Sequence, residues 1–151
     1  MSNKQRRLLQ QYHEAVHGVI FTEVSVGEYS LGRVPSKLRF IDGVRIVHTR
    51  DSSGKLRKFS EQEFRGKAEG KTVEAIEVDD DLNRWVIGQA IVGKVMLEIE
   101  YGVYAAIPVV VCRVWDKSLE QACLRLGVTA WTPGDGFLIR VNSTSAGAQS
   151  S

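Results

Sequence analysis

The chain has 151 residues, of which 43% are hydrophobic and 25% are charged, and its formal net charge at pH 7 is +2. This length suits one domain around one hydrophobic core, and the composition excludes a disordered or collagen-like chain. The small net charge excludes a strongly basic or acidic protein and identifies no partner. We predict a single domain over residues 1–141 and a disordered tail of small residues over 142–151.

The first half of the chain predicts a helix followed by strands. Apolar residues at helical spacing predict an amphipathic helix over residues 4–18. Runs rich in β-branched and aromatic residues then predict three strands, at residues 19–26, 38–48 and 72–78. The polar stretch that precedes the third strand receives no assignment.

The second half alternates helices and strands. Asp79, Asp80 and Asp81 predict the N-cap of a helix that runs to about Tyr101. The segments that follow are a buried strand, a helix ended by glycine, and two terminal strands around a Pro-Gly turn, at residues 107–114, 117–126, 128–131 and 137–141. This order predicts an α/β protein with a mixed central β-sheet and helices on both faces.

Location and redox state follow from simpler signals. The basic segment at residues 1–7 is not followed by the apolar block of a secretory signal, and no stretch reaches the length of a membrane-spanning helix. We therefore expect a cytoplasmic protein without a membrane partner. Cys112 in an apolar run and Cys123 in a helical pattern indicate buried, reduced thiols. The basic region at residues 50–71 is either a phosphate contact or a solvated loop.

Acidic residues interrupt or end two of the predicted strands: Asp42 on one, Glu77 and Asp79 on the other. A carboxylate near a core has to be paired, protonated or bound to a metal. Because side chains alternate along a strand, Glu77 and Asp79 share one face, and Asp42 meets Glu77 if the strands are neighbours. Two carboxylates there suit magnesium or manganese, which prefer oxygen ligands and retain waters.

These residues resemble the active site of the PD-(D/E)XK nuclease superfamily, which has the restriction-endonuclease-like fold. Its pattern is an Asp at a bend of one strand, Glu-x-Lys on the next strand, and commonly a Gln on the following helix. Asp42, Glu77 and Gln89 stand at the matching positions, and Glu14 lies where several branches add an acidic ligand. The resemblance covers residues 8–115 in element order. It implies an αβββαβ core and a nuclease that cleaves nucleic acid, DNA above all, with Mg²⁺ or Mn²⁺.

The lysine of that pattern is replaced by Asp79. In the family the lysine orients the attacking water and stabilises developing charge, which an aspartate cannot do as a cation. A substitute would have to come from Lys37, Lys71 or Lys94. Two interpretations stay open: a nuclease in which Asp79 helps to ligate the metal or position water, and a non-catalytic nucleic-acid-binding or assembly module of the same fold. A homodimer is expected for duplex cleavage, because so small a domain covers one strand at a time.

Structural roles and a zinc site are the alternatives. Asp42 before Gly43 suits a turn, and Glu77 has Arg39 or Arg45 as possible partners. The segment His13-Glu14-Ala15-Val16-His17 fits H-E-x-x-H, the helical zinc motif of metallopeptidases. A catalytic zinc needs a third ligand, and His48 is the only other histidine. We rank this peptidase hypothesis below the nuclease, and regard His13 and His17 as ordinary helix residues.

Overall fold

A seven-stranded mixed sheet, in the order β3-β1-β2-β4-β5-β6-β7, organises the protein in a computed structural model that describes residues 1–27, 38–51 and 53–140. The strands are β1 (Val19–Val26), β2 (Arg39–Ile46), β3 (Arg57–Lys58), β4 (Thr72–Asp81), β5 (Ala105–Val114), β6 (Thr129–Thr132) and β7 (Gly136–Ile139). β2 is antiparallel to both β1 and β4, whereas β4, β5 and β6 run parallel. The predicted tail at residues 142–151 lies outside the described residues.

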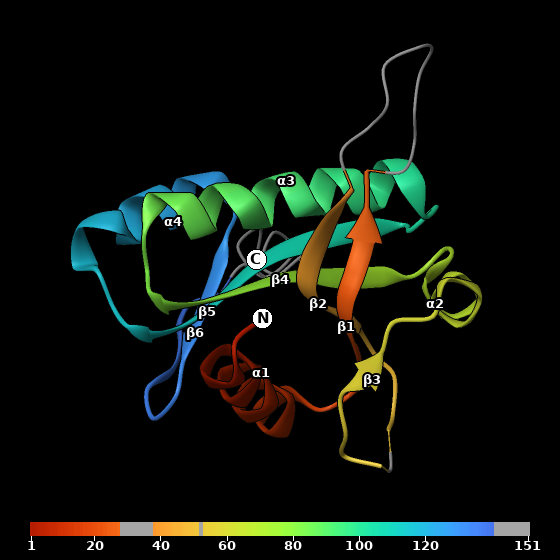
Figure 1. Cartoon of the computed structure of the whole chain (residues 1–151). Coiled ribbons are helices and arrows are strands. Elements are labelled where there is room, and N and C mark those ends of the chain that lie inside the picture. The colour runs from red at the N-terminus through yellow and green to blue at the C-terminus, as the bar shows by residue number, and fades with distance from the viewer. Residues whose placement is uncertain (28–37, 52, 141–151) are drawn as a thin grey trace, which may run out of the picture.

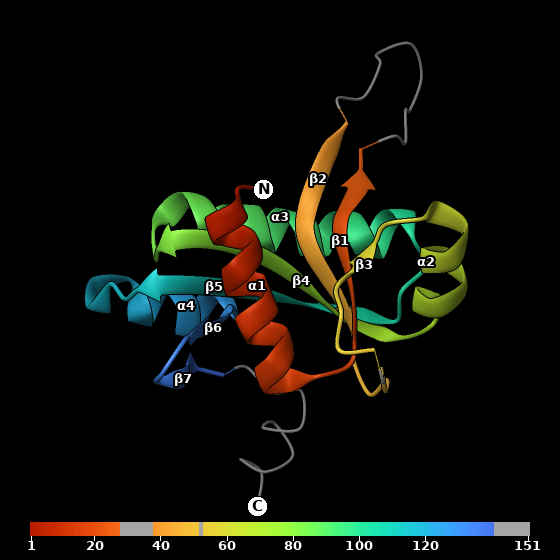
Figure 2. The same ribbon diagram turned by 60° about the horizontal axis from the view of Figure 1, so that its bottom comes forward.

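Helices cover both faces of this sheet (Figure 1). They are α1 (Asn3–Val16), α2 (Glu61–Ala68), α3 (Arg84–Glu100) and α4 (Glu120–Leu126), with a 3-10 turn, η1 (Lys117–Leu119), before α4. In the turned view α1 crosses in front of the sheet and α3 lies behind it (Figure 2). The parallel step from β4 to β5 needs such a crossover helix, which α3 supplies. The predicted α/β class with a mixed sheet flanked by helices is therefore confirmed; the specific restriction-endonuclease-like core remains a prediction.

Side chains of β4 alternate between the two helical layers. Ile76 packs with Leu9 and Tyr12 of α1, whereas Ala75 belongs to the cluster that contains Leu97 of α3. Gly93 of α3 faces β2, where an added Cβ would lie 3.4 Å from the Ile41 side chain. α3 thus lies close to β2 and β4 on the face that carries the odd-numbered residues of β4.

Most predicted elements are found within a few residues of their expected ends; the structure adds two elements and corrects one prediction. The unassigned polar stretch contains β3 and α2, and Phe64 of α2 is fully buried with its ring against Tyr101. The segment 79–81 is not the cap of α3: pairing with β5 continues to Asp81 and keeps these residues in β4. Asn83 is the N-cap, and its side chain accepts a hydrogen bond from the Val86 N–H at 2.8 Å.

Replacing Asn83 by alanine is expected to destabilise the protein by about 1 kcal/mol, because one N–H group at the start of α3 loses its acceptor and Asp79 loses the amide donor of Asn83. For a protein of this size the melting temperature should fall by roughly 3 °C. Asn83→Ser keeps an acceptor oxygen and is the control. Thermal unfolding followed by circular dichroism measures both, and equal melting temperatures for the alanine variant and the wild type would refute the cap.

Two further expectations concern the thiols and the membrane. Cys112 and Cys123 are both free and buried, as predicted. Among residues 1–27, 38–51 and 53–140, no helix is both long enough and apolar enough to cross a membrane.

Candidate active site

At a shared bend, the side chains of β1 and β2 switch from one face of the sheet to the other. Ile41 and Val44 belong to the same buried cluster although they are three residues apart, which a regular strand does not allow. Thr22 pairs with Gly43 and Val24 pairs with Ile41, so the pairing of the two strands skips Glu23 and Asp42. Glu23, opposite the bend, has a positive φ of 54°. Asp42 therefore lies where β2 bends.

Asp42 and Glu77 meet where β2 leaves β4. The last paired residues of the two strands are Gly43 and Ile76. Beyond this last pair, Asp42 Oδ2 accepts a hydrogen bond from the Val78 N–H at 2.9 Å. The carboxylate thus takes the place of a main-chain carbonyl of β2 as the acceptor for β4. The Glu77 carboxyl group hydrogen-bonds to the Asp42 carboxyl group and to the Asp42 N–H. The structure thus brings the two acids together; their role as metal ligands stays a prediction.

This carboxyl pair holds a proton more tightly than free carboxyl groups do. Glu77 is only 6% exposed. Burial, reinforced by the charge of Asp42 and their shared hydrogen bond, raises the pKa of Glu77 to about 9. Burial also raises the pKa of Asp42, against the lowering effect of the Val78 and Glu77 hydrogen bonds. The arrangement is one proton held between two acids, with neutral Glu77 as the donor to Asp42.

A cavity of about 670 Å³ opens beside Glu77 on the α3 side of the sheet. Its walls come from the end of β1, the start of β2, Glu77 of β4 and the side of α3 next to β2. Polar and aromatic side chains on these walls are Arg39, Phe40, Glu77, Arg84, Trp85 and Gln89, and the rest are small or apolar. Gln89 therefore lies in the same cavity as Glu77. This volume is within the range of small-molecule sites in proteins.

Asp79 and Glu14 do not join the pair. Asp79 Oδ1 accepts from the Asp80 N–H at 2.8 Å, and Oδ2 accepts from the Asn83 amide at 2.9 Å. Glu14 receives a hydrogen bond from Gln10 at 3.4 Å, on the other side of the sheet. The described residues hold no group of three or more His, Cys, Asp or Glu side chains arranged to bind a metal ion.

None of the lysines considered as substitutes is placed at this site. Lys94 binds Glu98 at 2.8 Å, and Lys71 precedes β4 at the end far from Glu77, roughly 20 Å along the strand. Lys37 lies outside the described residues. The cations that line the cavity are Arg39 and Arg84. The sequence offered Arg39 only as an ion-pair partner of Glu77, and it offered no signal for Arg84 beyond its place at the start of a predicted helix.

The structure does not have the helical geometry that a zinc site of the H-E-x-x-H type requires. α1 ends at Val16, and His17 has a φ of 60°, so the two histidines do not share one helical face. The His13 ring is buried and its Nε2 lies 2.8 Å from the Gly18 carbonyl oxygen. His13 fixes the end of α1, which is a structural role.

Several charged residues outside the cavity form ion pairs with one another. Arg45 binds Glu74 at 3.2 Å and not Glu77, which excludes one structural partner of the carboxyl pair. In the basic region at residues 50–71, Arg57 pairs with Glu63 and Arg65 with Glu61. These ion pairs reduce the positive charge that this region offers to phosphate.

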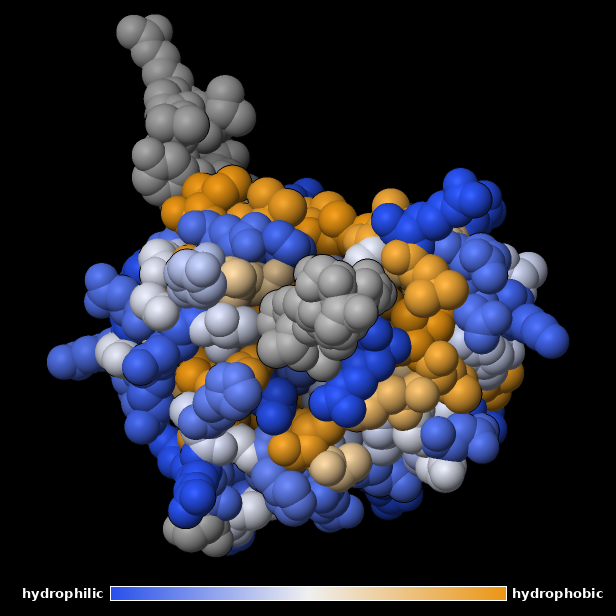
Figure 3. Space-filling model, turned by 180° about the vertical axis from the view of Figure 1, so that it is seen from behind, coloured by the Kyte–Doolittle hydropathy of each residue, from blue (hydrophilic) through white to orange (hydrophobic). Residues whose placement is uncertain are grey.

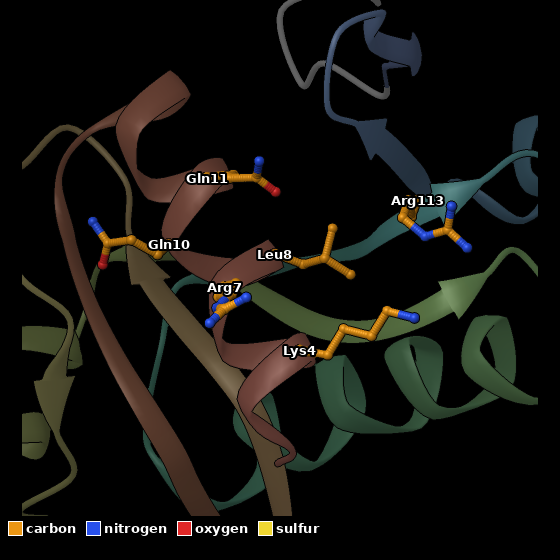
Figure 4. Close-up of a pocket in the computed structure, with 6 residues that line it drawn as sticks. All are labelled: Lys4, Arg7, Leu8, Gln10, Gln11 and Arg113. Carbon is orange, nitrogen blue, oxygen red and sulfur yellow. The ribbon is translucent and has the colours of Figure 1, made fainter.

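A second hollow of about 380 Å³ lies between α1 and β5 (Figure 4). Figure 4 shows Lys4 and Arg113 extending beyond Leu8 toward the same side. Both cations bind the Asp80 carboxylate, Lys4 at 3.4 Å and Arg113 at 2.9 Å. Asp80 offsets only part of the positive charge on the rim of this hollow, and no buried acid lines it, so it is the weaker candidate.

Comparison with known proteins adds no assignment to this geometry. No model of a protein family, no curated protein and no solved structure matches the chain. The candidate site is therefore defined by its residues alone.

Proposed function

We propose that this protein is a metal-dependent nuclease of the PD-(D/E)XK type that acts on DNA, or a protein derived from such a nuclease. The observation that carries the proposal is the buried Asp42–Glu77 carboxyl pair beside a cavity that also contains Arg39 and Arg84. An acid pair that only filled the core would be expected away from a solvent-connected cavity. A cytoplasmic location and a homodimer belong to the same proposal.

The donor set fits Mg²⁺ or Mn²⁺. Such ions take one or two carboxylates from the protein and keep several waters, so two acids without a third ligand are sufficient. Asp42 and Glu77 would hold the ion after losing their shared proton. A divalent ion bound there lowers the pKa of a bound water and neutralises charge on a phosphodiester oxygen.

The remaining side chains of the cavity would handle the substrate. Arg39 and Arg84 can bind phosphate oxygens through their planar guanidinium groups. Gln89 can orient a polar group near Glu77. Arginine supplies positive charge but cannot exchange a proton at neutral pH, so it replaces the family's lysine only in stabilising charge.

A non-catalytic module of the same fold is the second candidate. The observation in its favour is Asp79, which stands at the lysine position and has both oxygens engaged by Asp80 and Asn83. Such a module would bind nucleic acid equally well with and without a chelator. It would cleave nothing.

Calorimetric titration with Mn²⁺ and a cleavage assay on labelled DNA test the proposal. Wild type should bind about one ion and cleave, whereas Asp42→Asn and Glu77→Gln should lose at least tenfold in affinity and at least 100-fold in cleavage, since each removes a charged ligand. Glu14→Gln, which changes a glutamate outside the site, should behave as wild type. Ion uptake without cleavage would favour the module, and equal uptake by Glu77→Gln would refute the metal site.

A further inference from the structure

We infer that the cavity takes single-stranded nucleic acid, with one base stacked on Trp85. This inference rests on the proposed function, because it names the form of the substrate at the same site. It starts from the two aromatic residues on the cavity walls. Trp85 is 75% exposed and Phe40 is 57% exposed, and both line the cavity that Glu77 lines. Large aromatic side chains left in solvent point to a binding partner.

Each of these rings follows an arginine in the sequence. Arg39 and Phe40 begin β2 on one wall, and Arg84 and Trp85 begin α3 on the other. Both arginines are exposed, and among the described residues neither has an ion-pair partner. The exposed Trp85 ring with Arg84 beside it on α3, and Arg39 on the facing wall, match a nucleotide: a guanidinium binds phosphate and the ring stacks on the base.

The rings distinguish a single strand from a duplex. In a duplex the faces of the bases are covered by their neighbours, so an aromatic ring can stack on a base only where the strand is open or the base is turned out. A cavity of about 670 Å³ has room for one such nucleotide. The carboxyl pair then lies beside the phosphates of the strand whose base is held by Trp85.

A protein partner on α3 is the competing occupant. Val92, Val95 and Ile99 are 51%, 44% and 66% exposed, and they follow Trp85 at intervals of seven, three and four residues, which keeps them on one side of the helix. Figure 3, seen from behind, shows hydrophobic residues along the upper edge, where α3 lies. The arginines favour nucleic acid at the Trp85 end, because the far end of α3 carries Glu98 and Glu100 instead.

Fluorescence anisotropy with labelled oligothymidylate of about 12 nucleotides, in EDTA, tests this inference. Wild type should bind the single strand at least tenfold more tightly than a duplex of equal length. Trp85→Ala should weaken single-strand binding roughly tenfold, and Trp85→Tyr should restore most of it. Tyr104→Ala is the matched control, because Tyr104 is 81% exposed and does not line the cavity. Arg84→Gln should lower the salt dependence by about one counterion, and Arg125→Gln should not.

Equal binding of duplex and single strand, or full binding by Trp85→Ala, would overturn the inference. A Trp85→Ala variant that binds the single strand normally but sediments with a different molecular mass would also overturn the inference. That result would assign α3 to a protein partner. Because EDTA is present, the outcome is separate from the metal site. Trp85-dependent binding without Mn²⁺ uptake would uphold the inference and refute the nuclease, and Mn²⁺-dependent cleavage insensitive to Trp85→Ala would do the reverse.

Discussion

Glu77→Gln is expected to be more stable than the wild type at alkaline pH, by a margin that grows with pH. Glutamine has the shape of the neutral acid and keeps a donor for Asp42. In the wild type the pKa of Glu77 is raised from 4.5 in the unfolded chain to about 9 in the folded protein. Between these values the folded state holds a proton that the unfolded state has lost, so stability falls by about 1.4 kcal/mol per pH unit.

The sign of this effect is distinctive. The stabilising contribution of protonated Glu77 is complete below pH 4.5 and is lost as the pH rises toward 9. Between pH 5 and pH 8 the wild type should lose on the order of 4 kcal/mol relative to Glu77→Gln, with burial as the main cause. Asp42, and Glu23 whose charge raises the pKa of Asp42, are present in both proteins.

Urea unfolding of both proteins at several pH values measures the difference. Asp116→Asn is the control, because the hydrogen bond from Ser118 lowers the pKa of Asp116 below 3.8. Its difference from wild type should therefore stay constant above pH 5. A Glu77→Gln difference that also stays constant would show that Glu77 is ionised in the folded protein.

The elements were predictable from the sequence where a periodic pattern was long. The strand at residues 19–26 is β1 without a change of boundary, and the helix predicted to reach about Tyr101 ends at Glu100. The sequence pattern was misleading where pairing between strands determined the structure. Asp79 to Asp81 have the composition of a helix cap, but β5 offers backbone partners to that segment and keeps it extended.

The candidate site was predictable only in part, for the same reason. Asp42 and Glu77 were selected because acids at strand ends are costly, and the order of the strands brings them together. Glu23 and the bend opposite Asp42 depend on strand register, which no local pattern reveals. Arg39 and Arg84 enter the cavity because α3 lies close to β2, a consequence of Gly93 that the sequence does not announce.

The affinity for Mn²⁺ is expected to rise steeply with pH. Below pH 9 the pair holds a proton that the metal must displace from Glu77, so each ion bound releases about one proton. The apparent affinity should then increase about tenfold per pH unit, or about 100-fold between pH 6 and pH 8. The affinity for Mn²⁺ should therefore rise over the same pH range in which the stability of the free protein falls.

Calorimetric titrations in buffers of different ionisation enthalpy count the released protons directly. At pH 7 the wild type should release about one proton per ion. Asp42→Asn serves as a variant with one ligand weakened: it should lose affinity at every pH. An ion bound with the same affinity at pH 6 and pH 8, without proton release, would have to lie away from Glu77. Under the proposed function, the proton that burial favours on Glu77 competes with the divalent cation for the carboxyl pair.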